Sequence, residues 1–188
     1  MPDYNQLVTE VINELRAALR SVNPEAVNSL CQDIIDARRV FVAGQGRSGL
    51  RMQGFATRLM HLDQDVHVVG GVTTPAIGPG DLLIIGSGSG ETASLAVYAR
   101  RARELNAQVV LITIAEESTI GQLADVVIRI AAASPKLKDH ASGTPSIQPL
   151  GSLFEQALGL LLDIVVIQLM DDLNIDQNAM LVRHANLE

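Results

Sequence analysis

Hydrophobic residues are distributed in two different ways along the chain, and the difference predicts where helices and strands lie. Near the N-terminus, Leu7, Val11 and Leu15 recur every four residues, which is close to the period of an amphipathic helix. A second helix is expected after Asn23, with Pro24 in its first turn. Beyond these helices, short apolar runs alternate with further helical segments. They predict strands over 39–43, 66–69, 81–85, 108–114 and 126–130, with helices over 49–62, 92–105 and 119–123.

The strand segments are apolar along their whole length, rather than alternating between apolar and polar residues. Continuous apolar runs are typical of parallel strands that helices cover on both faces. We therefore predict an α/β fold, a three-layer α/β/α sandwich with a five-stranded parallel sheet, preceded by N-terminal helices. With 188 residues and no repeat or linker, the chain is expected to form one domain over 1–188, with a helical extension over about residues 1–37.

One further apolar run, residues 150–170, is long enough to cross a membrane. It carries Glu155 and Asp163 together with two glutamines, and these side chains are costly in lipid. We therefore expect a helix that is buried in the protein or at a subunit interface, and no membrane partner.

Composition narrows the class of ligand. The chain has a formal net charge of −7, only 3% aromatic residues and no Trp, which argues against the basic, base-stacking surfaces that bind nucleic acids. Its single cysteine, Cys31, excludes an internal disulfide, and the charged, amphipathic first 18 residues differ from a secretory signal. These features predict a protein of the reducing cytoplasm with no nucleic-acid partner.

The most informative polar segment, Gly-Ser-Gly-Ser-Gly-Glu-Thr, covers residues 86–92 between a predicted strand and a predicted helix. Its glycines allow backbone N–H groups to approach a ligand, its hydroxyls add donors, and the helix N-terminus adds positive partial charge. It has no lysine, which distinguishes it from the nucleotide P-loop. We predict that it binds a phosphate group through Ser87, Gly88, Ser89 and Thr92. In the alternative interpretation, Ser89 only caps the helix.

A second glycine-rich segment, Gly-Gln-Gly-Arg-Ser-Gly at residues 44–49, matches the G-x-G-x-x-G fingerprint of dinucleotide-binding proteins. Those proteins need an acidic residue at the carboxyl end of the second strand, where it binds the ribose hydroxyls. Here the chain reads Val-Val-Gly-Gly at 68–71, while Asp63 and Asp65 precede the strand. A nicotinamide cofactor is therefore the less favoured interpretation, and no cofactor is predicted.

The same segment can form another anion site. Gly46 and Ser48 supply backbone and hydroxyl donors, and Arg47 supplies a cation that could pair with a phosphate or with sugar oxygens. Because ligands of open parallel sheets bind at the carboxyl ends of the strands, the two glycine-rich segments are expected to form one pocket. The long irregular segment 134–149 is interpreted either as a surface crossover or as a lid.

Four further segments carry recognisable patterns: Arg-Leu-Met-His-Leu at 58–62, Thr-Thr-Pro-Ala-Ile at 73–77, Pro-Leu-Gly-Ser-Leu-Phe-Glu at 149–155 and Arg-His-Ala-Asn-Leu-Glu at 183–188. Together with the two glycine-serine segments, they resemble the sugar isomerase (SIS) domain and, more narrowly, the 6-phospho-3-hexuloisomerase family of the ribulose monophosphate pathway. The resemblance runs from about residue 39 to the last residue and is loose over the first helices.

The resemblance implies an enzyme that reversibly converts 3-hexulose 6-phosphate to fructose 6-phosphate during formaldehyde assimilation. It also implies a homotetramer with active sites shared between subunits. The reaction needs no redox cofactor, and no spacing typical of metal ligands is found in the sequence. Two alternatives stay open, namely another sugar-phosphate isomerase and a non-catalytic domain that senses a sugar phosphate.

Moving the carbonyl from C3 to C2 requires a base that removes the C2 proton and donors that stabilise the enediolate. Glu155 is the predicted base, because the resemblance points to a glutamate in this region. The competing interpretation is local, since Ser152 and Glu155 have the spacing of a capping box. His184 is predicted to shuttle the proton or polarise an oxygen. Without the resemblance it would be an ordinary solvated residue of the tail.

The other histidines and Glu91 have less specific interpretations. His61 lies near a predicted helix C-terminus and is a third catalytic candidate, although a structural role competes. His67, in a strand, and His140, in the irregular segment, are given no role. Glu91 is interpreted as an acid of the first helical turn rather than as a contact to sugar hydroxyls.

Overall fold

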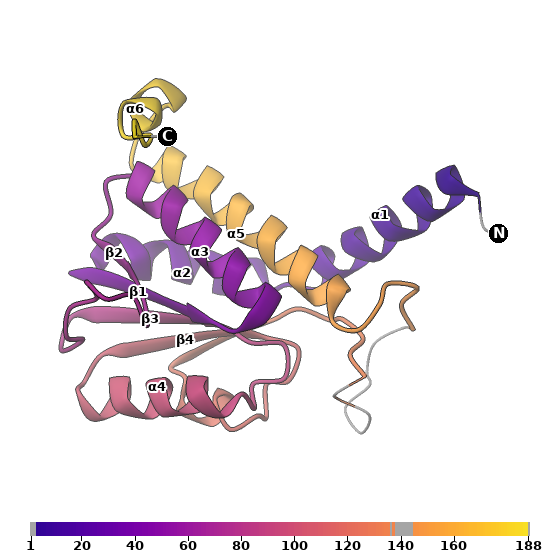
Figure 1. Ribbon diagram of the computed structural model, residues 1–188, viewed down its shortest axis with the longest axis horizontal. Coiled ribbons are helices and arrows are strands. Elements are labelled where there is room, and N and C mark those ends of the chain that lie inside the picture. The colour runs from indigo at the N-terminus through magenta and orange to yellow at the C-terminus, as the bar shows by residue number, and fades with distance from the viewer. Residues whose placement is uncertain (1–2, 136, 138–144, 188) are drawn as a thin grey trace.

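A computed structural model describes residues 3–135, 137 and 145–187 of the protein (Figure 1). The strands are β1 (Arg39–Gly44), β2 (Val66–Val68), β3 (Asp81–Gly86), β4 (Gln108–Thr113) and β5 (Val126–Arg129). All pairings are parallel, and the strand order is β2-β1-β3-β4-β5. The helices are α1 (Tyr4–Arg20), α2 (Pro24–Asp36), α3 (Gly46–His61), α4 (Ala93–Glu104), α5 (Ser152–Asp172) and α6 (Gln177–Val182). The predicted five-stranded parallel sheet is confirmed.

Helices cover both faces of the sheet. α3 and α5, with α2 beside them, lie on one face, and α4 lies on the other (Figure 1). Successive strand residues alternate between the two cores: Val40 and Val42 of β1 pack beneath the first group of helices, and Phe41 and Ala43 pack on the side of α4. This burial on both sides is the reason why the strands are continuous apolar runs, and it confirms the predicted three-layer architecture.

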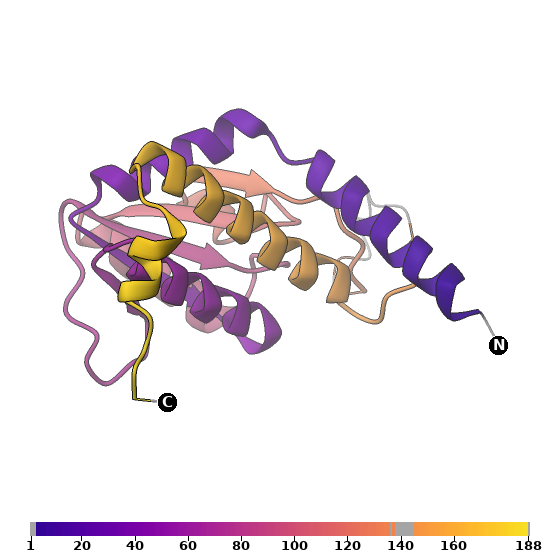
Figure 2. The same ribbon diagram turned by 90° about the horizontal axis from the view of Figure 1, so that it is seen from above.

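The two helices that precede β1 begin at typical capping residues. The carboxylate of Asp3 accepts a hydrogen bond from the Gln6 amide in α1, and Asn23 caps α2 in the same way. The C-terminal part of α1 packs against α5, whereas its N-terminal half projects away from the sheet (Figures 1 and 2). This projecting half leaves several apolar side chains exposed.

α5 is the apolar run that is long enough to cross a membrane, and among the described residues it is the one helix with that length and composition. Half of its apolar window is buried inside the structure, where Leu158 and Leu162 contribute to the core. The prediction of a helix buried in the protein is confirmed for this inner face. The outer face of α5 exposes Leu160, Ile164 and Ile167.

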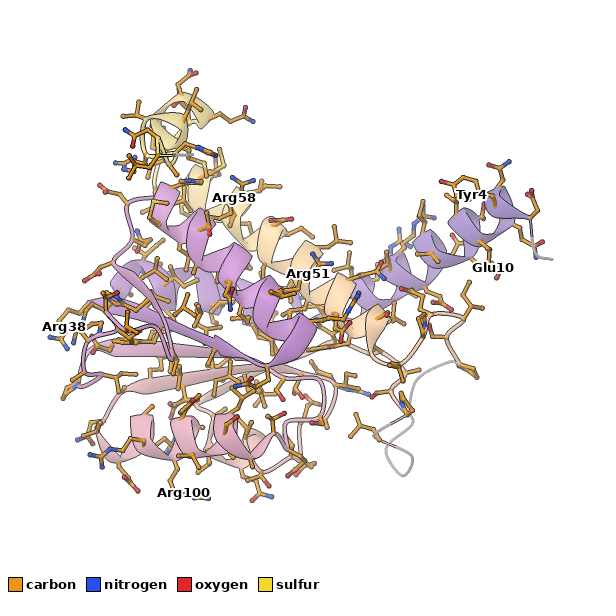
Figure 3. The ribbon with its side chains drawn as sticks, viewed as in Figure 1. Tyr4, Glu10, Arg38, Arg51, Arg58 and Arg100 are labelled. Atoms are coloured by element: carbon orange, nitrogen blue, oxygen red, sulfur yellow. The ribbon has the colours of Figure 1, made fainter. Side chains whose placement is uncertain are left out.

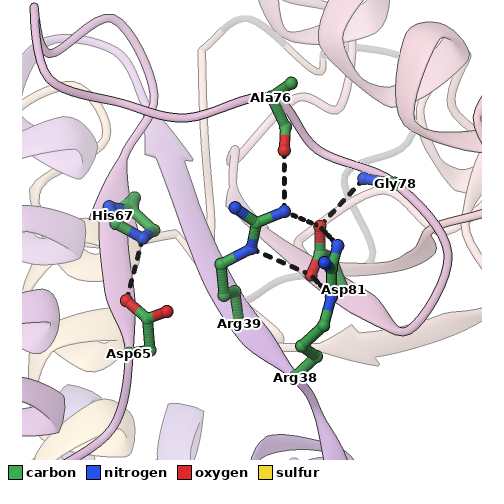
Figure 4. A network of polar contacts seen from close by, with 7 residues as sticks. All are labelled: Arg38, Arg39, Asp65, His67, Ala76, Gly78 and Asp81. Atoms are coloured by element: carbon green, nitrogen blue, oxygen red, sulfur yellow. Dashed lines mark hydrogen bonds and ion pairs between the residues drawn. The ribbon is translucent and has the colours of Figure 1, made fainter.

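At the amino edge of the sheet, where the strands begin, a network of polar contacts surrounds Asp81 (Figure 4). The Asp81 side chain is 0% exposed, and its two oxygens accept hydrogen bonds from Arg38 Nε and Nη2, Arg39 Nε and Nη2, and the Gly78 amide, at 2.8–3.3 Å. Arg39 also donates to the Ala76 carbonyl at 2.8 Å. These contacts fix the end of the β2–β3 connection to the start of β1.

The structure differs from the predicted helices in three places. α3 begins at Gly46 rather than at residue 49, and its N-cap Gln45 makes no side-chain capping bond that the sequence could have signalled. The helix predicted over 119–123 is a short 3₁₀ turn, η1 (Gly121–Leu123). α6 was not predicted, because six residues are too few to show a helical period.

Candidate active site

The order of the strands determines where the candidate site lies. Connections from β1 and β3 leave toward opposite sides of the sheet, so the carboxyl ends of these neighbouring strands border a crevice. Gly44 at the end of β1 is the register partner of Gly86 at the end of β3. The two glycine-rich segments that follow them therefore lie side by side, as predicted.

Glycine is required in the first segment for close packing of helix on strand. A Cβ atom on Gly44 would lie 2.9 Å from Gly49 Cα, and a Cβ on Gly49 would lie 2.8 Å from the Gly44 carbonyl oxygen. Such distances are too short for carbon atoms, so the first turn of α3 can sit against β1 only without these methyl groups. The G-x-G-x-x-G pattern is thus explained by the packing of helix on strand, without a dinucleotide.

A cavity of about 480 Å³ opens at this crevice. Its lining includes every residue predicted to bind substrate and the predicted base: Gly46, Arg47, Ser48, Ser87, Gly88, Ser89, Thr92 and Glu155. Residues that the sequence did not single out also contribute, including Ser134, Pro135, Leu150, Gly151 and Phe154. Leu150, Gly151 and Phe154 could have been identified from the sequence, because they lie close to Glu155 in the 149–155 segment.

The hydroxyls of the second segment take part in the fold of their own loop. Ser87 Oγ accepts from the Gly90 amide, and Ser89 Oγ accepts from the Glu91 amide, both at 3.2 Å. The N-cap of α4 is Thr92, so the interpretation of Ser89 as the helix cap is wrong. Thr92 makes no side-chain capping bond, and the first amides of α4 have no partner within the helix. Ser87, Ser89 and Thr92 all line the cavity.

The end of β4 and the loop that follows it hold this segment in place by hydrogen bonds. The hydroxyl of Thr113 and the amide of Ile114 both donate to the Gly88 carbonyl at 3.1 Å. The carboxylate of Glu91 accepts from the amide and the hydroxyl of Thr119, each at 2.7 Å, and these bonds hold the pKa of Glu91 below its usual value. Glu91 precedes the N-cap, so its interpretation as a first-turn acid is wrong, and its carboxylate is directed to Thr119.

Glu155 lies in the first turn of α5, and Arg47 Nε, from the first turn of α3, donates a hydrogen bond to its carboxylate. The capping box predicted for Ser152 and Glu155 is not formed: the N-cap is Gly151, which has no side-chain capping bond. The Glu155 side chain is about 19% exposed, against 60% for Arg47. The structure therefore presents a partly exposed carboxylate, held by a guanidinium, in the same cavity that the glycine-serine loop lines.

His184 lies at the other end of the same two helices. Its ring stacks on that of His61, with centroids 5.3 Å apart, and Asp63 binds the neighbouring Arg183 at 2.9 Å. Since Arg47 and His61 mark opposite ends of α3, the histidine pair is roughly 20 Å from Arg47 at 1.5 Å per helical residue. Within one chain, the structure does not bring His184 to Glu155.

The histidine pair borders a groove of about 390 Å³ between α3 and α5. Arg51 and Arg58 follow this groove along α3 (Figure 3). His61 is 3% exposed, and its burial, followed by charge interactions with Arg58 and His184, holds its pKa below the usual 6.5. A neutral imidazole is therefore favoured at this position at neutral pH.

The remaining candidates lie away from the cavity. His67 Nε2 is 2.9 Å from Asp65 Oδ1, at the amino end of β2 (Figure 4). Asp65 is therefore at the wrong end of the sheet for a ribose, as the sequence predicted. His140 and most of the 134–146 segment lie outside the described residues. Among the residues that are described, no group of three or more His, Cys, Asp or Glu side chains could hold a metal ion.

Comparison with known proteins gives the class of this fold and site. A family model described as SIS domain matches residues 33–158. The chain belongs to the SIS domain family.

More similar relatives narrow the assignment. The 3-hexulose-6-phosphate isomerase of Bacillus subtilis is 45% identical over 184 residues, which cover 97% of this chain and 98% of the relative. The 3-hexulose-6-phosphate isomerase of Mycobacterium gastri is 41% identical, with 99% and 92% covered. A Methanococcus jannaschii protein, whose crystal structure was taken to infer a 3-hexulose-6-phosphate isomerase function, superimposes with a TM-score of 0.84 at 32% identity, covering 97% and 99%. Within the SIS family, the chain belongs with the 3-hexulose-6-phosphate isomerases.

Proposed function

We propose that the chain, acting as one domain, interconverts 3-hexulose 6-phosphate and fructose 6-phosphate in the ribulose monophosphate pathway of formaldehyde assimilation. The observation that carries this proposal is the single cavity that the glycine-serine loop lines together with Glu155. Relatives that bear the name of this activity and match nearly the whole chain support it.

The phosphate end of the substrate is assigned to the glycine-serine loop. Ser87, Ser89 and Thr92 supply hydroxyls, and the N-terminus of α4 supplies amides and positive partial charge. Ser48 and the Gly46 backbone, in the first turn of α3, add donors from the other side of the crevice. This arrangement can hold a dianion in a protein whose net charge is −7, because the donors are local and oriented.

The sugar carbons then extend toward α5. Glu155 removes the proton from C2, which gives an enediolate with its charge on O3. The hydroxyl proton passes from O2 to O3, and the same carboxyl returns a proton at C3, so that the carbonyl moves from C3 to C2. Arg47 orients the Glu155 carboxylate through its Nε–H, and its exposed guanidinium lies where negative charge develops on the enediolate oxygen. The residues therefore supply a base and an electrostatic stabiliser.

His184 reaches such a site only from another subunit, because it lies roughly 20 Å from the Arg47–Glu155 pair along α3 in its own chain. A homotetramer with shared active sites would supply it. The apolar outer face of α5 and the projecting half of α1 offer surface for such contacts. The single, buried, unpaired Cys31 suits the reducing cytoplasm as the location of the enzyme.

The test is turnover by the purified protein with no added cofactor. Given 3-hexulose 6-phosphate, it should form fructose 6-phosphate, and in D2O the product should carry solvent deuterium at C3. Tight binding without conversion of any hexulose phosphate would instead indicate a sensing domain. Conversion of a pentose or heptose phosphate in preference to the hexulose phosphate would indicate another isomer pair.

A further inference from the structure

The segment that joins β5 to α5 supplies four residues of the cavity lining. Ser134 and Pro135 lie near its beginning, and Leu150 and Gly151 lie at its end, directly before the helix that carries Glu155. The positions of these residues decide the shape of the cavity on the side of the predicted base. The contacts that hold the two ends of this segment therefore influence the shape of the site.

The end of the segment is held by one carboxylate of the N-terminal helix. Glu14, in α1, accepts hydrogen bonds from Ser146 Oγ at 2.7 Å, from the Ile147 amide at 2.8 Å and from Gln148 Nε2 at 2.8 Å. Burial alone would raise the pKa of Glu14, but these three bonds outweigh it and lower the pKa below the usual 4.5. The carboxylate is thus ionised and fully engaged at neutral pH.

The contact continues into the catalytic helix. Gln148 is only 8% exposed, and its Oε1 accepts a hydrogen bond of 2.7 Å from Gln156 Nε2. Gln156 directly follows Glu155 in α5. A continuous series of hydrogen bonds therefore runs from Glu14 through Gln148 to the first turns of the helix that presents the predicted base.

Two further features show that this region is held under constraint. Leu150 has a φ of 55°, in the left-handed region that a non-glycine residue occupies only when its surroundings hold it there. At the other end of the segment, Ser21, the residue that follows α1, accepts a hydrogen bond of 2.9 Å from the Ala131 amide. The helix α1 and its C-cap thus hold both ends of the segment.

We propose that Glu14 is a positioning residue of the active site: its carboxylate fixes residues 146–148 and, through them, Leu150, Gly151 and the first turns of α5. This inference rests on the proposed isomerase function. It assigns the N-terminal helix to the active site, although the chain's catalytic and phosphate-binding candidates all follow β1. The role of the Glu14 carboxylate is geometric, because its two oxygens accept hydrogen bonds from three donors and fix their positions.

The test compares Glu14→Gln with Glu10→Gln, one helical turn earlier. Both changes remove one negative charge from α1, but Glu10 accepts its hydrogen bond from Gln6 of the same helix. A glutamine at position 14 has one acceptor oxygen and must present its NH2 group to at least one donor, so the 146–148 contacts are broken. We expect kcat to fall about 10- to 100-fold in Glu14→Gln, as a displacement of about 1 Å does, and to stay unchanged in Glu10→Gln.

Two readouts separate positioning from general damage. The inhibition constant of inorganic phosphate, which the glycine-serine loop binds, should stay within about twofold of the wild-type value, because the loop does not touch Glu14. Hydrogen exchange of the Ile147 amide should be faster in Glu14→Gln and unchanged in Glu10→Gln. If Glu14→Gln unfolds, Ser146→Ala removes one of the three bonds and should show smaller changes in the same direction.

Wild-type kcat in Glu14→Gln would overturn the proposal, and so would unchanged protection of Ile147. Loss of kcat in strict proportion to the fraction of protein that still binds phosphate would also overturn it, because the role would then be structural only. If the wild-type protein turns over no hexulose phosphate, the proposed function fails instead. The hydrogen-exchange comparison still tests the Glu14 contacts in that case.

Discussion

The two edges of the same sheet use polar groups in opposite ways. At the amino edge, Asp81 is buried, and two arginines and an amide fill its acceptor sites. At the carboxyl edge, Ser87, Ser89 and Thr92 line an open cavity, and the first amides of α4 have no partner in the helix. A satisfied network gives stability, whereas donors left for a ligand give binding. Substitutions at the two edges should therefore separate these two properties.

The largest effect is expected at the carboxyl edge from Glu155→Gln. The amide keeps the size of the side chain and can still accept from Arg47, but it cannot remove a proton, so kcat should fall by about 10³-fold or more. The free energy of unfolding and the affinity for phosphate should change little. Glu104→Gln, at the far end of α4 in an exposed pair with Arg101, is the control and should leave kcat unchanged. A normal kcat in Glu155→Gln would show that Glu155 is not the base.

The largest effect at the amino edge is expected from Asp81→Asn. This change leaves two arginines without their shared buried carboxylate and should lower the free energy of unfolding by about 2–4 kcal/mol in urea titrations. The kcat of the folded protein should be unaffected. Asp65→Asn removes a carboxylate at the same edge that is 60% exposed, and it should cost less than about 0.5 kcal/mol. Equal losses in the two variants would contradict the comparison.

A smaller effect on binding is expected from Ser89→Ala. Loss of one hydrogen bond to a charged phosphate should raise the KM for the sugar phosphate about tenfold, with stability nearly unchanged. Ser94→Ala is the matched control, because the Ser94 hydroxyl receives a long hydrogen bond from Gln45 and does not line the cavity. An unchanged KM in Ser89→Ala would place the phosphate elsewhere.

The smallest effect is expected on the stability of the protein at acidic pH. Burial alone would raise the pKa of Asp81, but hydrogen bonds from Arg39, Gly78 and Arg38 outweigh it and hold the pKa below the usual 3.8. A carboxyl with a lowered folded pKa stabilises the fold above its unfolded pKa, and that contribution is lost as pH falls through the folded value. Urea unfolding below about pH 4 should therefore show a steeper loss of stability in the wild type than in Asp81→Asn. Parallel profiles would exclude this linkage.

The sequence predicts most of the fold because its signals are local or topological. Each of the five short apolar runs became a strand, and the pairing of Gly44 with Gly86 follows from the order of a parallel sheet. The side-chain partners could not be predicted in the same way. Ser152 and Glu155 have the spacing of a capping box, but Arg47, which is 108 positions away, takes the Glu155 carboxylate instead. Long-range contacts of this kind leave no periodic pattern in the sequence.

The histidines illustrate the same limit. Nothing in the sequence placed His184 against His61, since their stacking depends on how α6 turns the tail back over the end of α3. Glu14 was missed because its three partners lie 132–134 positions away and α1 looks like an ordinary amphipathic helix. In both cases the residue type suits the contact, but only the tertiary fold selects the partner.

The contact of Gly44 with Gly49 has a consequence for how the site can vary. Main chain rests on main chain there, so the first turn of α3 has a spacing that no side-chain packing adjusts. An added methyl group, about 1.5 Å long, would act as a wedge beneath the helix. Arg47 and Ser48 would then be lifted away from Ser87, and an enzyme with every polar group of its pocket intact would lose its alignment through one carbon atom.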